Sequence, residues 1–110
     1  MKKATCPCHE TCPIDSVVKL IGGKWKLQIL CSLYNDGPLR FNTLKNKLAG
    51  VSNAALTNAL RQLEEDGLIN RIQFNEVPPH VEYDIEPCCE SLIQIVGQLT
   101  AWNAERMQKK

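Results

Sequence analysis

Two short amphipathic segments separated by a tight turn constrain the fold of this chain more than any other feature. The second segment, residues 52–67, has one apolar stripe at helical spacing, formed by Leu56, Leu60 and Leu63. Ser52 is a good N-cap for this helix, and Gly67 is placed to end it. The first segment, residues 41–50, carries a similar stripe, formed by Phe41, Leu44 and Leu48. Because only residues 49–51 separate the two stripes, the pattern predicts a helix-turn-helix.

The segments before this pair also predict helices. Residues 15–21 suit a short helix that Asp15 or Ser16 caps and that a pair of glycines ends. Residues 24–35 are apolar over most of a helical circumference, which indicates a central, buried helix.

The segments after the pair predict a small wing and a final helix. Residues 69–74 and 81–85 have the composition and alternation of paired strands, and residues 75–80, with two prolines, form a stiff loop between them. After Pro87 we expect a last helix that is more apolar than a terminal helix needs to be. This order predicts a mainly α-helical fold with a small β-hairpin wing, the winged helix-turn-helix.

The second helix of the pair has an outer face suited to reading DNA. Its leucines hold it to the core and leave a mostly polar face, made of Asn53, Ala54, Thr57, Asn58 and Arg61. Asn pairs with adenine, Arg with guanine or a phosphate, and the methyl groups of Ala and Thr touch that of thymine. A merely solvated face is the alternative. Phosphate-binding side chains on both flanks of this helix favour DNA binding over a solvated face. They are Arg40, Lys45, Lys47, Arg71 and His80.

Length and charge set wider limits. The chain has 110 residues, enough for one domain, and we expect a flexible, Cys-rich arm at 1–11 and the folded domain at 12–110. The net charge of +1 neither requires nor excludes a nucleic acid, because a local basic face decides phosphate binding. No apolar run approaches the roughly 20 residues that span a bilayer, and no secretory signal pattern is present. We therefore expect no membrane partner and a cytoplasmic location.

Five short stretches carry a more specific signal when they are taken together. They are Cys12–Ile14, Ile21–Lys26, Gly37–Phe41, Leu60–Ile69 and Val77–Tyr83. In order and spacing the chain resembles the HxlR-type winged helix-turn-helix regulators of bacteria. The combination of Gly-Gly-Lys-Trp-Lys with a Val-Pro-Pro wing is specific, whereas each piece alone is weak.

The resemblance implies a homodimer that is joined through the first and last helices. The implied dimer contacts are Val17, Leu92, Ile95, Val96, Leu99 and Trp102. By position, Lys24 and Arg40 resemble phosphate contacts, and His80 resembles a contact at the wing tip. The complete predicted set of DNA contacts is Lys24, Arg40, Lys45, Ser52, Asn53, Ala54, Thr57, Asn58, Arg61, Arg71 and His80.

The chain departs from the family at two of these places. Family members usually carry Lys or Arg near position 53 or 54 and in place of His80, so the basic face here is weaker. One alternative is a lower affinity for DNA, with binding that depends on the remaining lysines. The other is binding that strengthens as His80 becomes protonated.

Six cysteines are many for a chain expected in a reducing compartment, where they serve as metal ligands, redox-active thiols or core residues. The resemblance implies that Cys12 senses an oxidant or electrophile, and Cys6 and Cys8 are candidate resolving partners. A nearby helix N-terminus would favour the Cys12 thiolate. Alternatively, a zinc or copper(I) site is offered by Cys6, Cys8, His9 and Cys12, although their spacing is not a standard zinc pattern.

The other cysteines have simpler interpretations. We expect Cys31 to be a core residue of the second helix. Cys88 and Cys89 open the last helix, where they are packing residues, thiols whose thiolates the helix dipole favours, or ligands of a soft metal or an arsenical.

These residues bear on three classes of function. A thiol oxidoreductase is disfavoured because no Cys-x-x-Cys is present, so we expect no enzyme and no cofactor. A metal-binding or interaction module on a winged-helix scaffold is the remaining alternative. We expect a regulator that binds a double-stranded DNA operator as a homodimer, acts as a repressor and responds to a small electrophile or oxidant.

Overall fold

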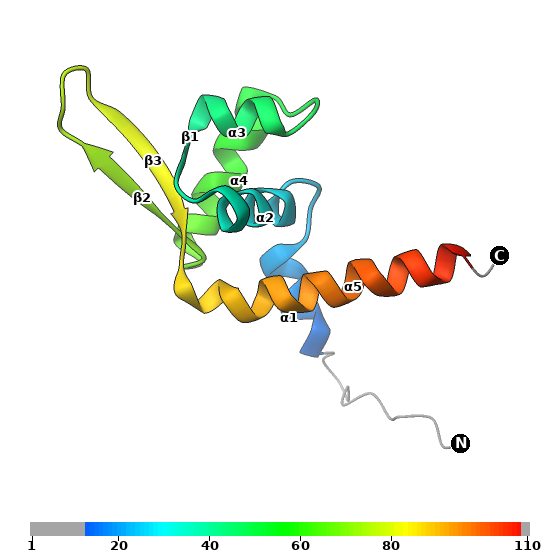
Figure 1. Ribbon diagram of the computed structural model, residues 1–110. Coiled ribbons are helices and arrows are strands. Elements are labelled where there is room, and N and C mark those ends of the chain that lie inside the picture. The colour runs from blue at the N-terminus through cyan, green and yellow to red at the C-terminus, as the bar shows by residue number, and fades with distance from the viewer. Residues whose placement is uncertain (1–12, 109–110) are drawn as a thin grey trace, which may run out of the picture.

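The computed structural model describes residues 13–108, and its elements follow the order expected for a winged helix-turn-helix (Figure 1). The elements are α1 (Pro13–Ile21), α2 (Lys26–Asp36), β1 (Leu39–Arg40), α3 (Phe41–Lys47), α4 (Asn53–Glu65), β2 (Ile69–Phe74), β3 (His80–Ile85), the 3-10 turn η1 (Pro87–Cys89) and α5 (Glu90–Gln108). The predicted fold class, mainly α with a small β wing, is confirmed. The expected arm at residues 1–11 lies outside the described residues.

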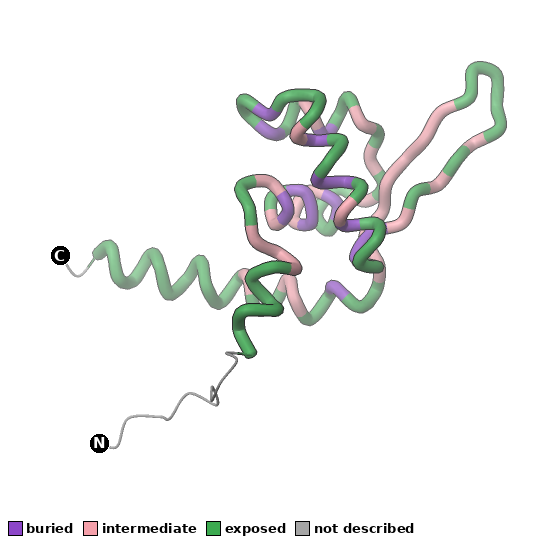
Figure 2. The backbone as a smooth tube through the Cα atoms, turned by 180° about the vertical axis from the view of Figure 1, so that it is seen from behind, coloured by how far each residue is buried: buried purple, intermediate pink, exposed green. Residues whose placement is uncertain are grey.

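The core is formed where α2, α3 and α4 meet the base of the wing (Figure 2). The largest side chains that are almost completely buried are Ile29, Leu30, Leu33, Leu44, Leu56, Leu63, Ile69 and Cys89. Burying one Leu or Ile in this way contributes roughly 1.5–3 kcal/mol. The expectation that the second helix is central and buried is therefore correct for one face of α2, and Cys31 on that helix is only half-buried.

Local signals fix both ends of α4. The Oγ of Ser52 accepts a hydrogen bond from the Ala55 amide at 3.0 Å, so the predicted N-cap is confirmed. At the other end Gly67 adopts a φ of +77°. Its amide donates to the Glu64 carbonyl and the Leu68 amide to the Leu63 carbonyl, which satisfies two carbonyls of the last turn.

The wing has three strands, and sequence patterning predicted only two of them. β2 and β3 pair antiparallel with Phe74 opposite His80, and β1 adds to the outer side of β3 with Leu39 opposite Tyr83. β1 has two residues, too few to show an alternating pattern. The loop after β2 projects away from the helices, as its prolines predicted (Figure 1).

Several boundaries differ from those expected. The first helix begins at Pro13, and the Ser16 Oγ donates back to the Pro13 carbonyl at 3.1 Å instead of capping the start. The second begins at Lys26 because Gly23, with a φ of +100°, turns the chain just before it. The last helix begins at Glu90, after the 3-10 turn that Pro87 opens.

α1 and α5 pack against this core only at one end of each helix, through Leu20 and Ile21 of α1 and through Leu92 and Ile93 of α5. Neither contains a buried residue, and α5 extends away from the rest of the molecule (Figures 1 and 2). Among the helices of residues 13–108, none is long and apolar enough to cross a membrane.

Candidate nucleic-acid interface

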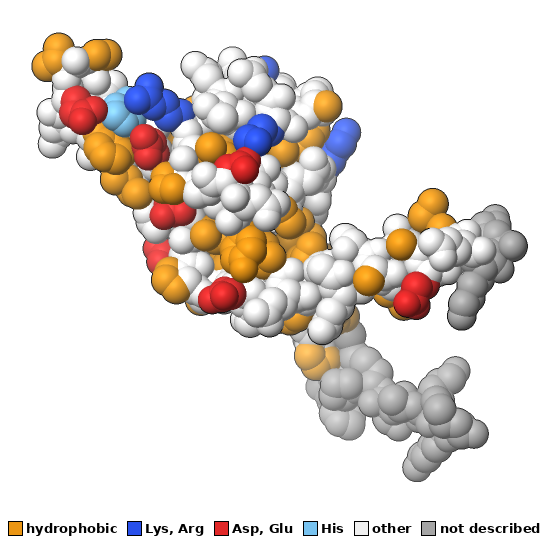
Figure 3. Space-filling model, in the orientation of Figure 1, with side chains coloured by type: hydrophobic (Ala, Val, Ile, Leu, Met, Phe, Trp, Pro, Cys, Tyr) orange, Lys and Arg blue, Asp and Glu red, His pale blue; other side chains and the backbone are white. Residues whose placement is uncertain are grey.

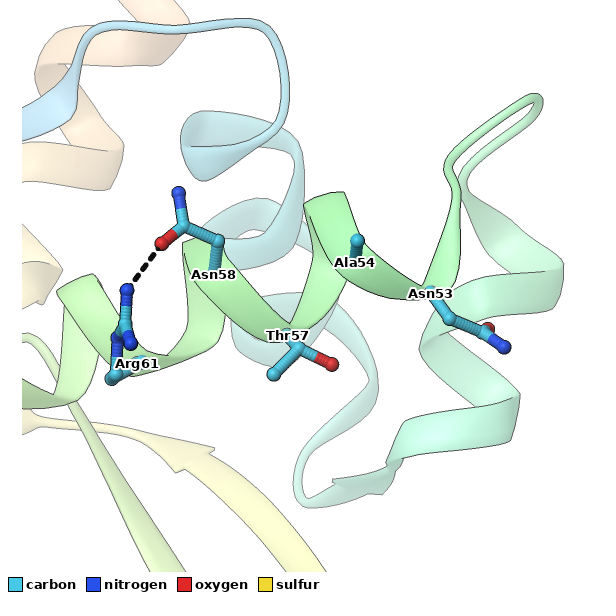
Figure 4. Close-up of a pocket in the computed structure, with 5 residues that line it drawn as sticks. All are labelled: Asn53, Ala54, Thr57, Asn58 and Arg61. Carbon is cyan, nitrogen blue, oxygen red and sulfur yellow. Dashed lines mark hydrogen bonds between the residues drawn. The ribbon is translucent and has the colours of Figure 1, made fainter.

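The outward face of α4 gathers the five side chains that the sequence predicted for it. They line a shallow, open hollow of about 420 Å³, and the lining residues are Asn53, Ala54, Thr57, Asn58 and Arg61. All five are exposed, and Figure 4 shows them projecting outward from the helix. No atom of the described chain covers this face, so it is free to contact a partner.

The opposite face of α4 prevents the helix from turning. Leu56 and Leu63 are completely buried, and Ala59 and Leu60 are nearly so. Rotating the helix would expose these side chains, at a cost of roughly 1.5–3 kcal/mol for each leucine. The orientation of the outward face is therefore set by the core.

Two side chains on the outward face are held together. The Nη2 of Arg61 donates to the Oδ1 of Asn58 at 2.6 Å, one turn earlier on the helix (Figure 4). Arg61 keeps further N–H donors, and Asn58 keeps its NH₂ group. The pair therefore presents donors in a restricted geometry instead of two freely rotating side chains.

The basic residues predicted for the flanks have different surroundings. Arg40, at the N-cap of α3, and Arg71, on β2, are both exposed. Lys45 is half-buried, and its Nζ donates to the Val51 carbonyl at 3.3 Å, so it stabilises the turn between α3 and α4. Lys47 pairs with Asp36 at 2.6 Å. Lys and Arg side chains are visible over the wing and over the helix-turn-helix in Figure 3.

His80 lies in a more acidic environment than the sequence suggested. It is the first residue of β3, so it stands at the base of the wing loop and not at its tip. Its Nδ1 lies 3.4 Å from the Glu76 carboxylate and its Nε2 lies 3.2 Å from the Glu82 carboxylate. The ring also stacks on Phe74 with 4.5 Å between centroids. Glu82 lies two residues after His80 on the same strand, so the alternation of side chains along β3 places both on one face and could have predicted this contact.

The two thiols at the start of the last helix, Cys88 and Cys89, differ in exposure. Cys89 is buried, and burial together with the neighbouring Cys88 raises its pKa to about 11. The prediction of a favoured thiolate is therefore wrong for Cys89, and the packing interpretation is correct. Cys88 is exposed, with its Sγ 3.7 Å from the Gly67 carbonyl. Burial also raises the pKa of Cys31.

The predicted sensing and metal-binding residues cannot be placed. Cys6, Cys8, His9 and Cys12 lie outside the described residues. Within residues 13–108 no group of three or more His, Cys, Asp or Glu side chains is arranged to hold a metal ion.

The predicted dimer contacts divide between the core and the surface. Leu92 and Val96 are half-buried, and Leu92 packs on the core. The others are exposed, and they are Val17, Ile95, Leu99 and Trp102. Sequence reasoning omitted Ile14, Val18 and Met107, which are also exposed apolar residues of α1 and α5. Apolar side chains continue along α5 in Figure 3.

Comparisons with known proteins agree with this architecture. Residues 20–110 match the HxlR-like helix-turn-helix family. The chain is 42% identical over 96 residues to the HTH-type transcriptional regulator YtcD of Bacillus subtilis, covering 87% of this chain and 75% of the relative.

Solved structures of transcriptional regulators also match this chain. The crystal structure of the HTH-type transcriptional regulator YtcD matches with a TM-score of 0.82 at 41% identity, over 87% of this chain and 97% of that one. The redox regulator HypR in its oxidised form matches with a TM-score of 0.78 at 35% identity, over 86% of this chain and 96% of that one. The chain therefore belongs to the HxlR-like helix-turn-helix family of transcriptional regulators.

Proposed function

We propose that the protein binds specific DNA sequences by placing α4 in the major groove. The observation that carries this proposal is the exposed face of α4, whose side chains are of the types that read base edges while buried leucines hold the opposite face. Exposed Arg40, at the start of α3, and exposed Arg71, on the wing, flank this helix and would contact phosphates. Ser52, at the helix start, would contact the backbone beside them.

The functional unit of this proposal is a homodimer joined through α1 and α5. Ile95, Leu99 and Trp102 follow each other at helical spacing along α5, with 52%, 53% and 61% of each residue exposed. A contiguous apolar stripe of this kind on a soluble chain marks a protein contact. A second copy is the occupant that suits a regulator, because a twofold pair presents two α4 helices to half-sites about one helical turn apart.

Repression follows from the same arrangement, since a dimer seated on an operator competes with the transcription machinery for the DNA.

We propose further that an oxidant or electrophile releases the dimer from the operator by modifying Cys12, with Cys6 or Cys8 as resolving thiols. The support is the relative HypR, which is named a redox regulator. The residues concerned lie outside the described part of the chain, so chemistry and not geometry supports this step.

A mobility-shift titration on the DNA upstream of the protein's own coding region tests the proposal. Reduced wild type should bind, and Thr57→Ala should bind more weakly because a base contact is lost. Treatment with a mild oxidant should reduce the affinity of the wild type but not that of Cys12→Ser. Affinity that is unchanged by oxidant in both would remove the thiol switch. Absence of binding under every condition would remove the DNA-binding proposal itself.

A further inference from the structure

Lys26 is a largely buried lysine at the edge of the proposed DNA-binding surface. Only 8% of this residue is exposed, although lysine is almost never buried to this degree without an opposite charge. Its Nζ donates to the Leu20 carbonyl at 3.3 Å. No carboxylate of residues 13–108 forms an ion pair with it. An ammonium group has three donors, so two of them have no partner in the described chain.

Lys26 lines a cavity that lies between the α1–α2 loop and α4. The cavity has a volume of about 170 Å³, well below the roughly 300–1,000 Å³ of sites for drug-sized ligands, so it fits a small group. The remaining lining residues are Gly22, Gly23, Lys24, Trp25, Ala55, Asn58, Ala59 and Gln62. In Figure 4 the Asn58 side chain points to the side of α4 on which this loop runs.

The loop wall of the cavity is positively charged. Lys24 is exposed, with its Nζ 4.8 Å from the centre of the Trp25 ring. α2 begins here with no side-chain cap and no acidic residue in its first turn, so the positive end of its dipole is not compensated. Both glycines suit this shape, since a Cβ on Gly22 would lie 2.3 Å from the Val18 carbonyl oxygen and Gly23 has a φ of +100°.

We propose that this cavity binds one small oxyanion group, a phosphate or a carboxylate, through the Lys26 ammonium and the first amides of α2. Asn58 lines both this cavity and the outward face of α4, so the bound group sits beside the proposed DNA contacts. The inference rests on the proposed function only where it takes a DNA phosphate as the source of the anion. The source is either a backbone phosphate of the bound duplex or a free anion that occupies the same place.

Binding of the anion is tested without DNA. Inorganic phosphate is titrated into ¹⁵N-labelled protein at constant ionic strength, with chloride as the balancing ion. The amides of Gly22 and Gly23 should shift saturably. In Lys26→Met the affinity should fall about 10- to 100-fold, the worth of a charge-assisted hydrogen bond. Lys19→Met, which removes an exposed lysine of α1, should titrate like the wild type. Lys26→Gln replaces the Met variant if a thermal melt shows that it does not fold.

A second measurement identifies the source of the anion. Affinity for a random-sequence duplex is measured against KCl concentration for the wild type and Lys26→Met. If a duplex phosphate fills the cavity, the slope of the log–log plot should fall by about 0.9 in the variant. An unchanged slope, together with lost phosphate binding, assigns the cavity to a free anion. The inference is overturned if phosphate shifts the two glycine amides no more than chloride does, or equally in both proteins. A wild type that binds phosphate but no duplex contradicts only the proposed function.

Discussion

Replacing Arg61 with alanine tests the proposal that α4 reads DNA. In the described chain the guanidinium of Arg61 makes one side-chain hydrogen bond, to Asn58, and it is exposed. Its loss should therefore change the free energy of unfolding by no more than about 0.5 kcal/mol. A lost bidentate contact to guanine costs about 1–3 kcal/mol of binding, which corresponds to about 5- to 150-fold weaker affinity for the operator.

Two further variants separate base reading from simple charge. Arg61→Lys keeps the charge but loses the planar fork, so it should retain the salt dependence of binding and lose discrimination between the operator and a scrambled duplex. Arg106→Ala is a matched control, because Arg106 donates to Asn103 on α5 with the same three-residue spacing, at 2.9 Å. The oligomeric state of the Arg106→Ala variant is measured in the same experiment by sedimentation.

Fluorescence anisotropy with the upstream operator and the scrambled duplex provides the measurement. The reasoning is refuted if Arg61→Ala binds both duplexes as the wild type does. It is also refuted if Arg106→Ala, still dimeric, loses as much affinity as Arg61→Ala, because α4 would then have no special role.

Three further changes test other parts of the structure. Ser52→Ala should lower the free energy of unfolding by about 1 kcal/mol through loss of the cap on α4, measured by urea denaturation; an unchanged midpoint contradicts the capping role. Leu99→Glu should convert the proposed dimer into a monomer in sedimentation experiments and weaken operator binding, and a variant that stays dimeric excludes this stretch of α5 from the interface. Cys89 has a folded-state pKa raised from 9.0 to about 11, so its protonated form is favoured by folding, and its contribution to stability should be complete below pH 9 and decline as the pH rises towards 11. Cys89→Ser should remove that part of the alkaline loss of stability, and an identical pH profile in both proteins contradicts it.

Much of the helix-turn-helix was predictable because its signals are local. The Ser52 cap, the leucine stripe and Gly67 act within one helix, where spacing alone decides which side chains share a face. The five residues of the outward face follow from the same periodicity. β1 could not be predicted, because a two-residue strand exists only through its pairing with β3.

The amino-acid sequence alone was enough to predict the order of the helices and of the two longer strands, the family and the exposed face of α4. The burial and the ion pairs of the basic residues, in contrast, depend on tertiary contacts. Lys26 became buried against the α1–α2 loop, and the packing of α2 against α3 paired Lys47 with Asp36. The physical reason is that caps and helical faces depend on residues a few positions apart, whereas burial and charge pairing depend on which distant segments folding brings together.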